Sequence, residues 1–236
     1  MVQEKKGIKK QVVSSKRRKE KSATPGKDTY FIWLLVIVLI SFLAFLPVLH
    51  NGFVNLDDDR YILNNPLLFS IDLKEIFSRY VEGNYHPFTM LIYAVEYQLF
   101  GLNAQGYHAV NLLLHLFNII LVFYAVFLIS NKTIIALVAA MLFGIHPLHV
   151  ESVAWASELK DLLYTFFFLA AYVCYLRYLN ESKRKFYLWC LILFLLSLLS
   201  KAMAVSLPLV LLLTDYFKGR KLNAKAWLEK IPFFAL

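Results

Sequence analysis

From residue 30 onward the chain consists mainly of long apolar runs separated by short polar segments. Crossing the roughly 30 Å hydrocarbon core of a bilayer takes about 20 apolar residues in a helix. Runs near that length occupy 30–49, 109–129, 133–150 and 162–179. A longer run, 186–217, carries Lys201 near its middle, so we expect it to divide at Ser200–Lys201 into two short, tilted spans. The pattern predicts an all-α polytopic transmembrane helix bundle of about six spans, with the start of another at 231–236.

The polar segment 51–106, between the first two runs, is too long to be a simple connector. Its second half, 86–101, has apolar side chains at helical spacing: Phe88, Leu91, Ile92, Val95 and Leu99. We interpret this half as an amphipathic helix lying in the membrane interface; a partial span is the alternative. The carboxylate of Glu96 and the polar residues around it favour the interfacial helix.

The distribution of charge predicts the orientation of the bundle. Residues 1–29 contain ten Lys and Arg against three acids, and the later short loops on the same side carry Lys132, 183–185 and 218–221. The segment 51–106 has the opposite balance, with seven acids and three bases. By the positive-inside rule, the N-terminus and the basic loops are cytoplasmic and 51–106 lies outside.

Composition excludes a single soluble globule. Hydrophobic residues make up 59% of the chain and charged residues 17%, against roughly 45–50% apolar residues in soluble domains. We therefore expect a basic, disordered cytoplasmic tail at 1–29 and a transmembrane domain at 30–236. The tail can be a topological signal or a contact for anionic lipid or nucleic acid; we favour the signal and expect no nucleic-acid partner. Cys174 and Cys190 lie inside apolar runs, so no disulfide framework is predicted.

Three consecutive carboxylates, Asp57, Asp58 and Asp59, follow the first predicted span. Adjacent carboxylates repel one another, so at least one should have a raised pKa or a cationic partner. Such a carboxylate can act as a general base on an acceptor hydroxyl, and Asp59 can help to hold a divalent cation. The alternative is a solvated acidic turn.

A second polar motif, His146-Pro147-Leu148-His149-Val150-Glu151, stands at the predicted outer end of the run 133–150. Pro147 tends to end the helix, which would present His149 and Glu151 at the membrane boundary. The spacing is a poor one for zinc, and we favour hydrogen bonds to a substrate or a helix-end cap over a metal site.

Four polar residues in and just before the run 109–129 share one helix face. They are His108, which precedes the run, and Asn111, His115 and Asn118 within it. At membrane depth such groups must face protein or a water-filled cavity. They can be hydrogen-bonding contacts between helices, or one wall of a polar cavity open to the outside.

Ammonium groups are predicted at the outer ends of two spans, at Lys160–Asp161 and at Ser200–Lys201. A lone boundary lysine often only extends toward water. Here outward carboxylates and outward lysines are expected at one depth, a combination suited to transferring a group from a lipid-linked phosphate.

Several long strings together resemble a known family: NLDDDRYILNNP, YHPFTMLIYAVEYQLFGL, GYHAVNLLLHLFN, FGIHPLHVESVAWASELKDLLYTFFFL and SKAMAVSLPLVLLLTDYF. They resemble the membrane half of bacterial tetratricopeptide-repeat (TPR) proteins, which are similar to the eukaryotic transmembrane-and-TPR O-mannosyltransferases. More distantly, they are similar to other lipid-dependent glycosyltransferases of the GT-C class. The resemblance covers about residues 30–236.

The resemblance implies a bundle in the bacterial cytoplasmic membrane with a periplasmic active site, a polyprenyl-phosphate sugar donor and an acceptor protein. The family's catalytic acidic pair falls on Asp57 and Asp58. Substrate binding is expected at His86, His146, His149, Glu151, Lys160, Asp161 and Lys201. Relatives often read Glu-Arg-Lys-Asp where this chain has Leu159 in place of the arginine. Since relatives continue into further spans and a TPR array, we expect this chain to be a truncated membrane half.

The expected reaction is an inverting transfer of a hexose such as mannose to a hydroxyl, with no certain cofactor beyond a possible divalent cation. Two other functional classes fit parts of the pattern. An ion-coupled transporter would use the acidic triplet and the His108–Asn118 stripe, and a non-catalytic anchor would only hold a TPR scaffold in the membrane.

Overall fold

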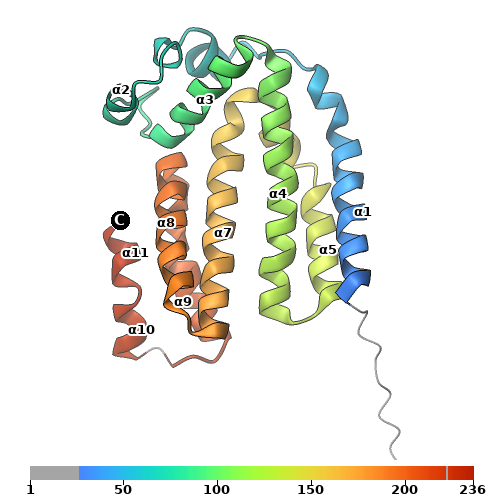
Figure 1. The fold of residues 1–236 in the computed structure, drawn as a ribbon, viewed down its shortest axis with the longest axis vertical. Coiled ribbons are helices and arrows are strands. Elements are labelled where there is room, and N and C mark those ends of the chain that lie inside the picture. Colours follow the sequence, from blue (N-terminus) through green and yellow to red (C-terminus); the bar gives the residue numbers. More distant parts are fainter. Residues whose placement is uncertain (1–26, 222) are drawn as a thin grey trace, which may run out of the picture.

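The computed structural model describes residues 27–221 and 223–236, which are almost entirely helical (Figure 1). The bundle is formed by α1 (Lys27–Phe45), α4 (Ala104–Ser130), α5 (Thr133–Gly144), α7 (Leu159–Glu181), α8 (Arg184–Ser200) and α9 (Leu207–Phe217). Two helices, α2 (Leu73–Ser78) and α3 (Pro87–Phe100), lie at one end of it. We call this the α3 end. Shorter elements are η1 (Leu46–His50), η2 (Asp59–Leu63), η3 (Pro66–Leu68), α6 (His149–Ala154), η4 (Ala156–Glu158), η5 (Ala202–Ser206), α10 (Ala224–Leu228) and α11 (Ile231–Ala235).

Helix α4 is the centre of the packing, with α5 and α1 on one side and α7 followed by α8 on the other. Three helical stretches are long and apolar enough to cross a bilayer: Tyr30–His50, Ala104–Ser130 and Ala156–Glu181. They coincide with three of the predicted runs. The all-α membrane bundle predicted from the sequence is confirmed.

The predicted span 133–150 is wrong in its extent, because α5 ends at Gly144. At about 1.5 Å per residue, α5 is shorter than a bilayer core. His146 precedes a proline, which disfavours the helical conformation just after α5. Gly144, the last residue of α5, lies directly against α1. A Cβ built at Gly144 would stand 2.4 Å from Ser41 Oγ, so the contact requires glycine.

The predicted division of 186–217 is confirmed. Helix α8 ends at Ser200, and Lys201 is extended, with φ −160° and ψ 135°. Thr89 Oγ1 on α3 donates a hydrogen bond to the Ser200 carbonyl at 2.9 Å, so a side chain from the α3 end satisfies a backbone group freed by the break. This bond therefore ties the end of α8, next to Lys201, to α3.

Helix α3 confirms the predicted helix at 86–101, but its burial differs from a simple amphipathic pattern. The apolar side chains of Val95 and Leu99 are exposed, whereas Tyr93 and Glu96 are buried against the bundle. The apolar positions seen in the sequence thus divide into two groups. Val95 and Leu99 point away from the protein, whereas Phe88, Leu91 and Ile92 are half-buried, and the last two pack against a buried cluster. Residues 1–26 of the predicted tail lie outside the described residues. Its last three residues, 27–29, belong to α1, which begins at Lys27.

Glu96 is 2% exposed, and neither of its carboxylate oxygens has a hydrogen-bond partner among the described residues. Burial without a cation disfavours the charged form and raises the pKa of Glu96 well above its ordinary value of 4.5. Between pH 4.5 and this raised pKa, the Glu96 carboxyl is therefore protonated in the folded protein and ionised in the unfolded chain.

Glu96→Gln is expected to stabilise the protein near neutral pH. As pH rises above 4.5 the unfolded chain ionises at Glu96 while the folded protein does not, so the free energy of unfolding falls toward the raised pKa. Glutamine does not ionise, so the variant does not lose this part of the free energy of unfolding as the pH rises. Chemical denaturation at pH 4 and pH 8 should show a gain for the variant, by about 1–3 kcal/mol, at pH 8 only. A gain of the same size at both pH values would contradict the assignment.

Candidate active site

The polar stripe of α4 is fully buried, and each of its members contacts a backbone carbonyl of another segment. Asn111 and Asn118 donate to the carbonyls of Trp155 and Leu162 at 2.9 and 3.0 Å. His115 Nε2 lies 3.0 Å from the Gly144 carbonyl, and His108 Nε2 lies 3.4 Å from that of Gly52. The stripe thus forms hydrogen bonds between segments, and these side chains are used in holding η4, α5 and α7 around α4.

The acidic triplet separates into three environments. Asp58 is fully buried and accepts two backbone N–H groups, from Val54 and from Ser157, each at 2.8 Å. These bonds close the turn after the first span and join it to η4. Asp58 therefore has the contacts of a structural carboxylate, while its catalytic role stays a prediction.

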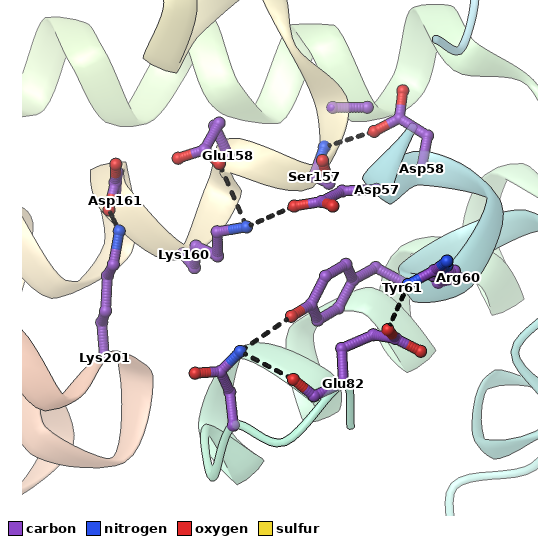
Figure 2. A network of polar contacts seen from close by, with 12 residues as sticks. Asp57, Asp58, Arg60, Tyr61, Glu82, Ser157, Glu158, Lys160, Asp161 and Lys201 are labelled. Carbon is purple, nitrogen blue, oxygen red and sulfur yellow. Dashed lines mark hydrogen bonds and ion pairs between the residues drawn. The ribbon is translucent and has the colours of Figure 1, made fainter. Parts of the chain in front are cut away.

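Asp57 faces the opposite way, toward Lys160 at the start of α7 (Figure 2). Its Oδ2 lies 3.2 Å from Lys160 Nζ, and its side chain is 44% exposed. The same ammonium is 3.0 Å from Glu158 Oε1 and 4.7 Å from the centre of the Tyr61 ring. Asp57 Oδ1 has no hydrogen-bond partner among the described residues, so one oxygen remains open.

A second lysine comes from the break after α8. The Lys201 ammonium is paired with Asp161, one residue beyond Lys160 on α7 (Figure 2). It also lies 5.9 Å from the centre of the Tyr164 ring. Lys160 is thus held in place by two carboxylates and an aromatic ring, and Lys201 by one carboxylate and one ring.

These groups border a cavity of about 480 Å³. It is lined by Tyr61, Asn84, Tyr85, His86, Lys160, Lys201, Ala202, Met203, Val205 and Ser206. Lys160 and Lys201 supply its positive charges, and the carboxylates of Asp57, Glu158 and Asp161 contact those lysines without lining the cavity. Met203 and Val205 form an apolar side that is more than 60% exposed. The cavity therefore combines two lysines, both paired with carboxylates, with an exposed apolar side.

His86 adds a neutral polar group to the cavity. It is 5% exposed, and its Nε2 has no hydrogen-bond partner in the described part of the chain. Burial, followed by the charges of Lys160 and Lys201, lowers the pKa of His86 from 6.5 to about 4. The ring is therefore uncharged near neutral pH and can hydrogen-bond to a ligand.

The other predicted substrate-binding residues do not line this cavity. His146 and Glu151 are exposed, and His149 packs beside Phe143 and His115, with ring centres 4.3 and 5.7 Å away. These residues do follow the end of α5, as predicted, but they lie in α6 and the turn before it, away from the cavity.

Asp59 begins the turn η2 without a cluster of ligands around it. No group of three or more His, Cys, Asp or Glu side chains within residues 27–221 and 223–236 could hold a metal ion. These residues do not by themselves fit a divalent cation, and Asp59 as a ligand stays a prediction.

Sequence reasoning missed two features of the site. Tyr61 lies beneath the Lys160 ammonium, and Glu158 supplies a second carboxylate to it. The spacing of Glu158 two residues before Lys160 was visible in the sequence, but the contact depends on the turn η4. Nothing in the sequence placed Tyr61 opposite α7.

Comparison with known proteins gives a consistent set of relatives. A protein O-mannosyl-transferase of Caenorhabditis elegans is 33% identical over 205 residues, which is 79% of this chain. The Drosophila melanogaster protein O-mannosyl-transferase Tmtc1 is 30% identical over 75% of the chain. Human protein O-mannosyl-transferase TMTC3 is 33% identical over 53% of it. The chain resembles the protein O-mannosyl-transferases over most of its length.

The resemblance covers a minor part of these larger O-mannosyl-transferases. The chain spans 28%, 22% and 15% of the nematode, fly and human relatives, respectively. No family model matches the sequence, and no solved structure matches it. The relatives support the resemblance seen in the sequence motifs, while the roles of individual residues depend on the geometry described above.

Proposed function

We propose that the protein is a glycosyltransferase that moves a sugar, mannose by analogy with its relatives, from a polyprenyl-phosphate donor to a protein hydroxyl. One observation carries the proposal: a cavity lined by Lys160 and Lys201 opens beside an apolar wall, with Asp57 on the other side of Lys160. A donor phosphate would lie at the lysines, and its polyprenyl chain along Met203 and Val205.

The proposed reaction inverts the anomeric centre. The acceptor oxygen attacks the anomeric carbon as its proton passes to Asp57, which acts as general base. The bond between that carbon and the phosphate oxygen breaks, and the electron pair leaves with the phosphate. Lys160 and Lys201 stabilise the negative charge that develops there, and His86 can donate a hydrogen bond to it.

The proposal places the α3 end outside the cytoplasm. The basic residues of the short loops, Lys132, 183–185 and 218–221, lie in or directly beside connections at the other end of the bundle, which the positive-inside rule assigns to the cytoplasm. The transporter alternative has less support, because one polar atom of each residue in the α4 stripe already contacts a backbone carbonyl.

Lys201→Gln tests the phosphate site. In purified protein supplied with polyprenyl-phosphate mannose and an acceptor peptide, we expect the KM for the donor to rise about 10-fold or more, because a charge-assisted hydrogen bond is lost. Lys74→Gln is the matched control, since Lys74 is an exposed lysine of α2 that does not line the cavity. An unchanged KM in Lys201→Gln would contradict the phosphate site, and no sugar transfer by the wild-type protein would contradict the function.

A further inference from the structure

A second, larger cavity lies at the end of the bundle opposite α3. Its volume is about 1150 Å³, and it is bounded by the α7–α8 turn, the end of α9 and the α10 segment. The lining residues are Tyr178, Leu179, Asn180, Ser182, Arg184, Tyr187, Leu188, Lys218, Arg220, Leu228 and Glu229. Three of them are cations and one is an acid.

Arg220 is neutralised by a buried ionic network. Its guanidinium lies 2.6 Å from Glu229 Oε2 and 3.2 Å from Asp215 Oδ2. Asp215 also binds the Lys230 ammonium at 2.7 Å, and both of these side chains are fully buried. Two cations and two carboxylates therefore balance within this network.

Arg184 and Lys218 remain as uncompensated charges. Lys218 Nζ donates to the carbonyls of Leu128 and Ile129, at 2.8 and 3.2 Å, which fixes the ammonium at the end of α4. Arg184 is exposed, and its side chain has no ion pair or hydrogen bond to the residues that the structure describes. The cavity thus presents a net charge of about two positive units, from one fixed and one free cation.

The cavity also has an apolar side. Leu179, Leu188 and Leu228 line it, and Leu188 and Leu228 are 57% and 62% exposed. A soluble anion would leave this surface in contact with water. An amphiphile would place its anionic group at Arg184 and Lys218 and its acyl chains along the leucines.

We propose that this cavity binds the phosphate headgroup of an anionic phospholipid, in the leaflet opposite the candidate active site. The inference is independent of the proposed glycosyltransferase function, because it uses none of the residues of the first cavity. Basic pockets between membrane helices on the cytoplasmic side are typical binding sites for such headgroups.

Native mass spectrometry of the protein in a non-ionic detergent, titrated with phosphatidylglycerol, tests the proposal. We expect one tightly bound lipid in the wild-type protein, and about fivefold weaker binding in Arg184→Gln. Lys185→Gln is the matched control: it removes the same charge one residue further along α8, outside the cavity, and should bind as the wild type does.

Three outcomes would overturn the site. Equal weakening in Arg184→Gln and Lys185→Gln would show only a diffuse attraction to basic residues. Equal binding of phosphatidylcholine would show that the lipid's net charge is not recognised. Competition by millimolar glycerol phosphate as strong as by phosphatidylglycerol would identify a soluble phosphate ligand in place of a lipid.

Discussion

Asp57→Asn is expected to lower the rate of sugar transfer by about 10²–10⁴-fold, because the amide cannot accept the proton of the acceptor hydroxyl. The loss should appear in kcat, since Lys160 and Lys201 still bind the donor phosphate. Steady-state rates with saturating polyprenyl-phosphate mannose measure it. A variant that retains the wild-type kcat would remove Asp57 from the mechanism.

Asp58→Asn is the informative companion to that variant. An asparagine carbonyl can keep one of the two backbone N–H bonds, to Val54 or to Ser157, while its NH₂ group faces the other. Because Asp58 joins these two segments, the variant should lose thermal stability. A structural role alone predicts that transfer persists at temperatures where the variant is folded. If Asp58 were also the base, transfer would be lost at those temperatures too. The pair of variants therefore separates the two carboxylates by different measurements.

Lys230→Met is expected to destabilise the protein by about 3–5 kcal/mol, because it leaves a buried carboxylate without its principal cation. Lys230 Nζ lies 2.7 Å from Asp215 Oδ2 and 2.5 Å from the Tyr175 hydroxyl, and all three side chains are fully buried. Arg220, 3.2 Å from the same carboxylate oxygen, is the only other cation paired with Asp215 among the described residues. Denaturant titration in mixed micelles gives the free energy of unfolding.

Two controls accompany the Lys230 variant. Lys221→Met removes an exposed lysine nearby and should change the free energy of unfolding by less than about 0.5 kcal/mol. Adding Asp215→Asn to Lys230→Met should restore part of the loss, since the unpaired charge is then removed. If the single variant were as stable as the wild type, the network would contribute nothing to the fold.

The sequence predicted well the features that follow from local rules. The helix of α3 and the shared face of the α4 stripe follow from periodicity, and the break at Ser200–Lys201 follows from the length of the run and its central lysine. All three are found. The end of α5 at Gly144 falls earlier than the proline alone indicated, and the contact of Gly144 with Ser41 joins two residues far apart in the chain.

The candidate site was predicted only in part for the same reason. Asp57, Lys160 and Lys201 were expected in one compartment, and the fold brings the first two into contact and the lysines to one cavity. His149 and Glu151 were expected there too, but their direction is set by α6 and the turn before it. The burial of Glu96 and of the Lys230 network depends on packing between distant segments, which no local pattern reveals.

The α4 stripe has a consequence for interpreting variants of this protein. Replacing Asn111 and Asn118 with leucines would make α4 more hydrophobic, and a hydropathy plot would rate it a better membrane helix. The carbonyls of Trp155 and Leu162 would nevertheless each lose the side-chain donor that joins them to α4. Such a chain would insert normally but would lack two contacts between helices, so insertion assays alone would not register the change.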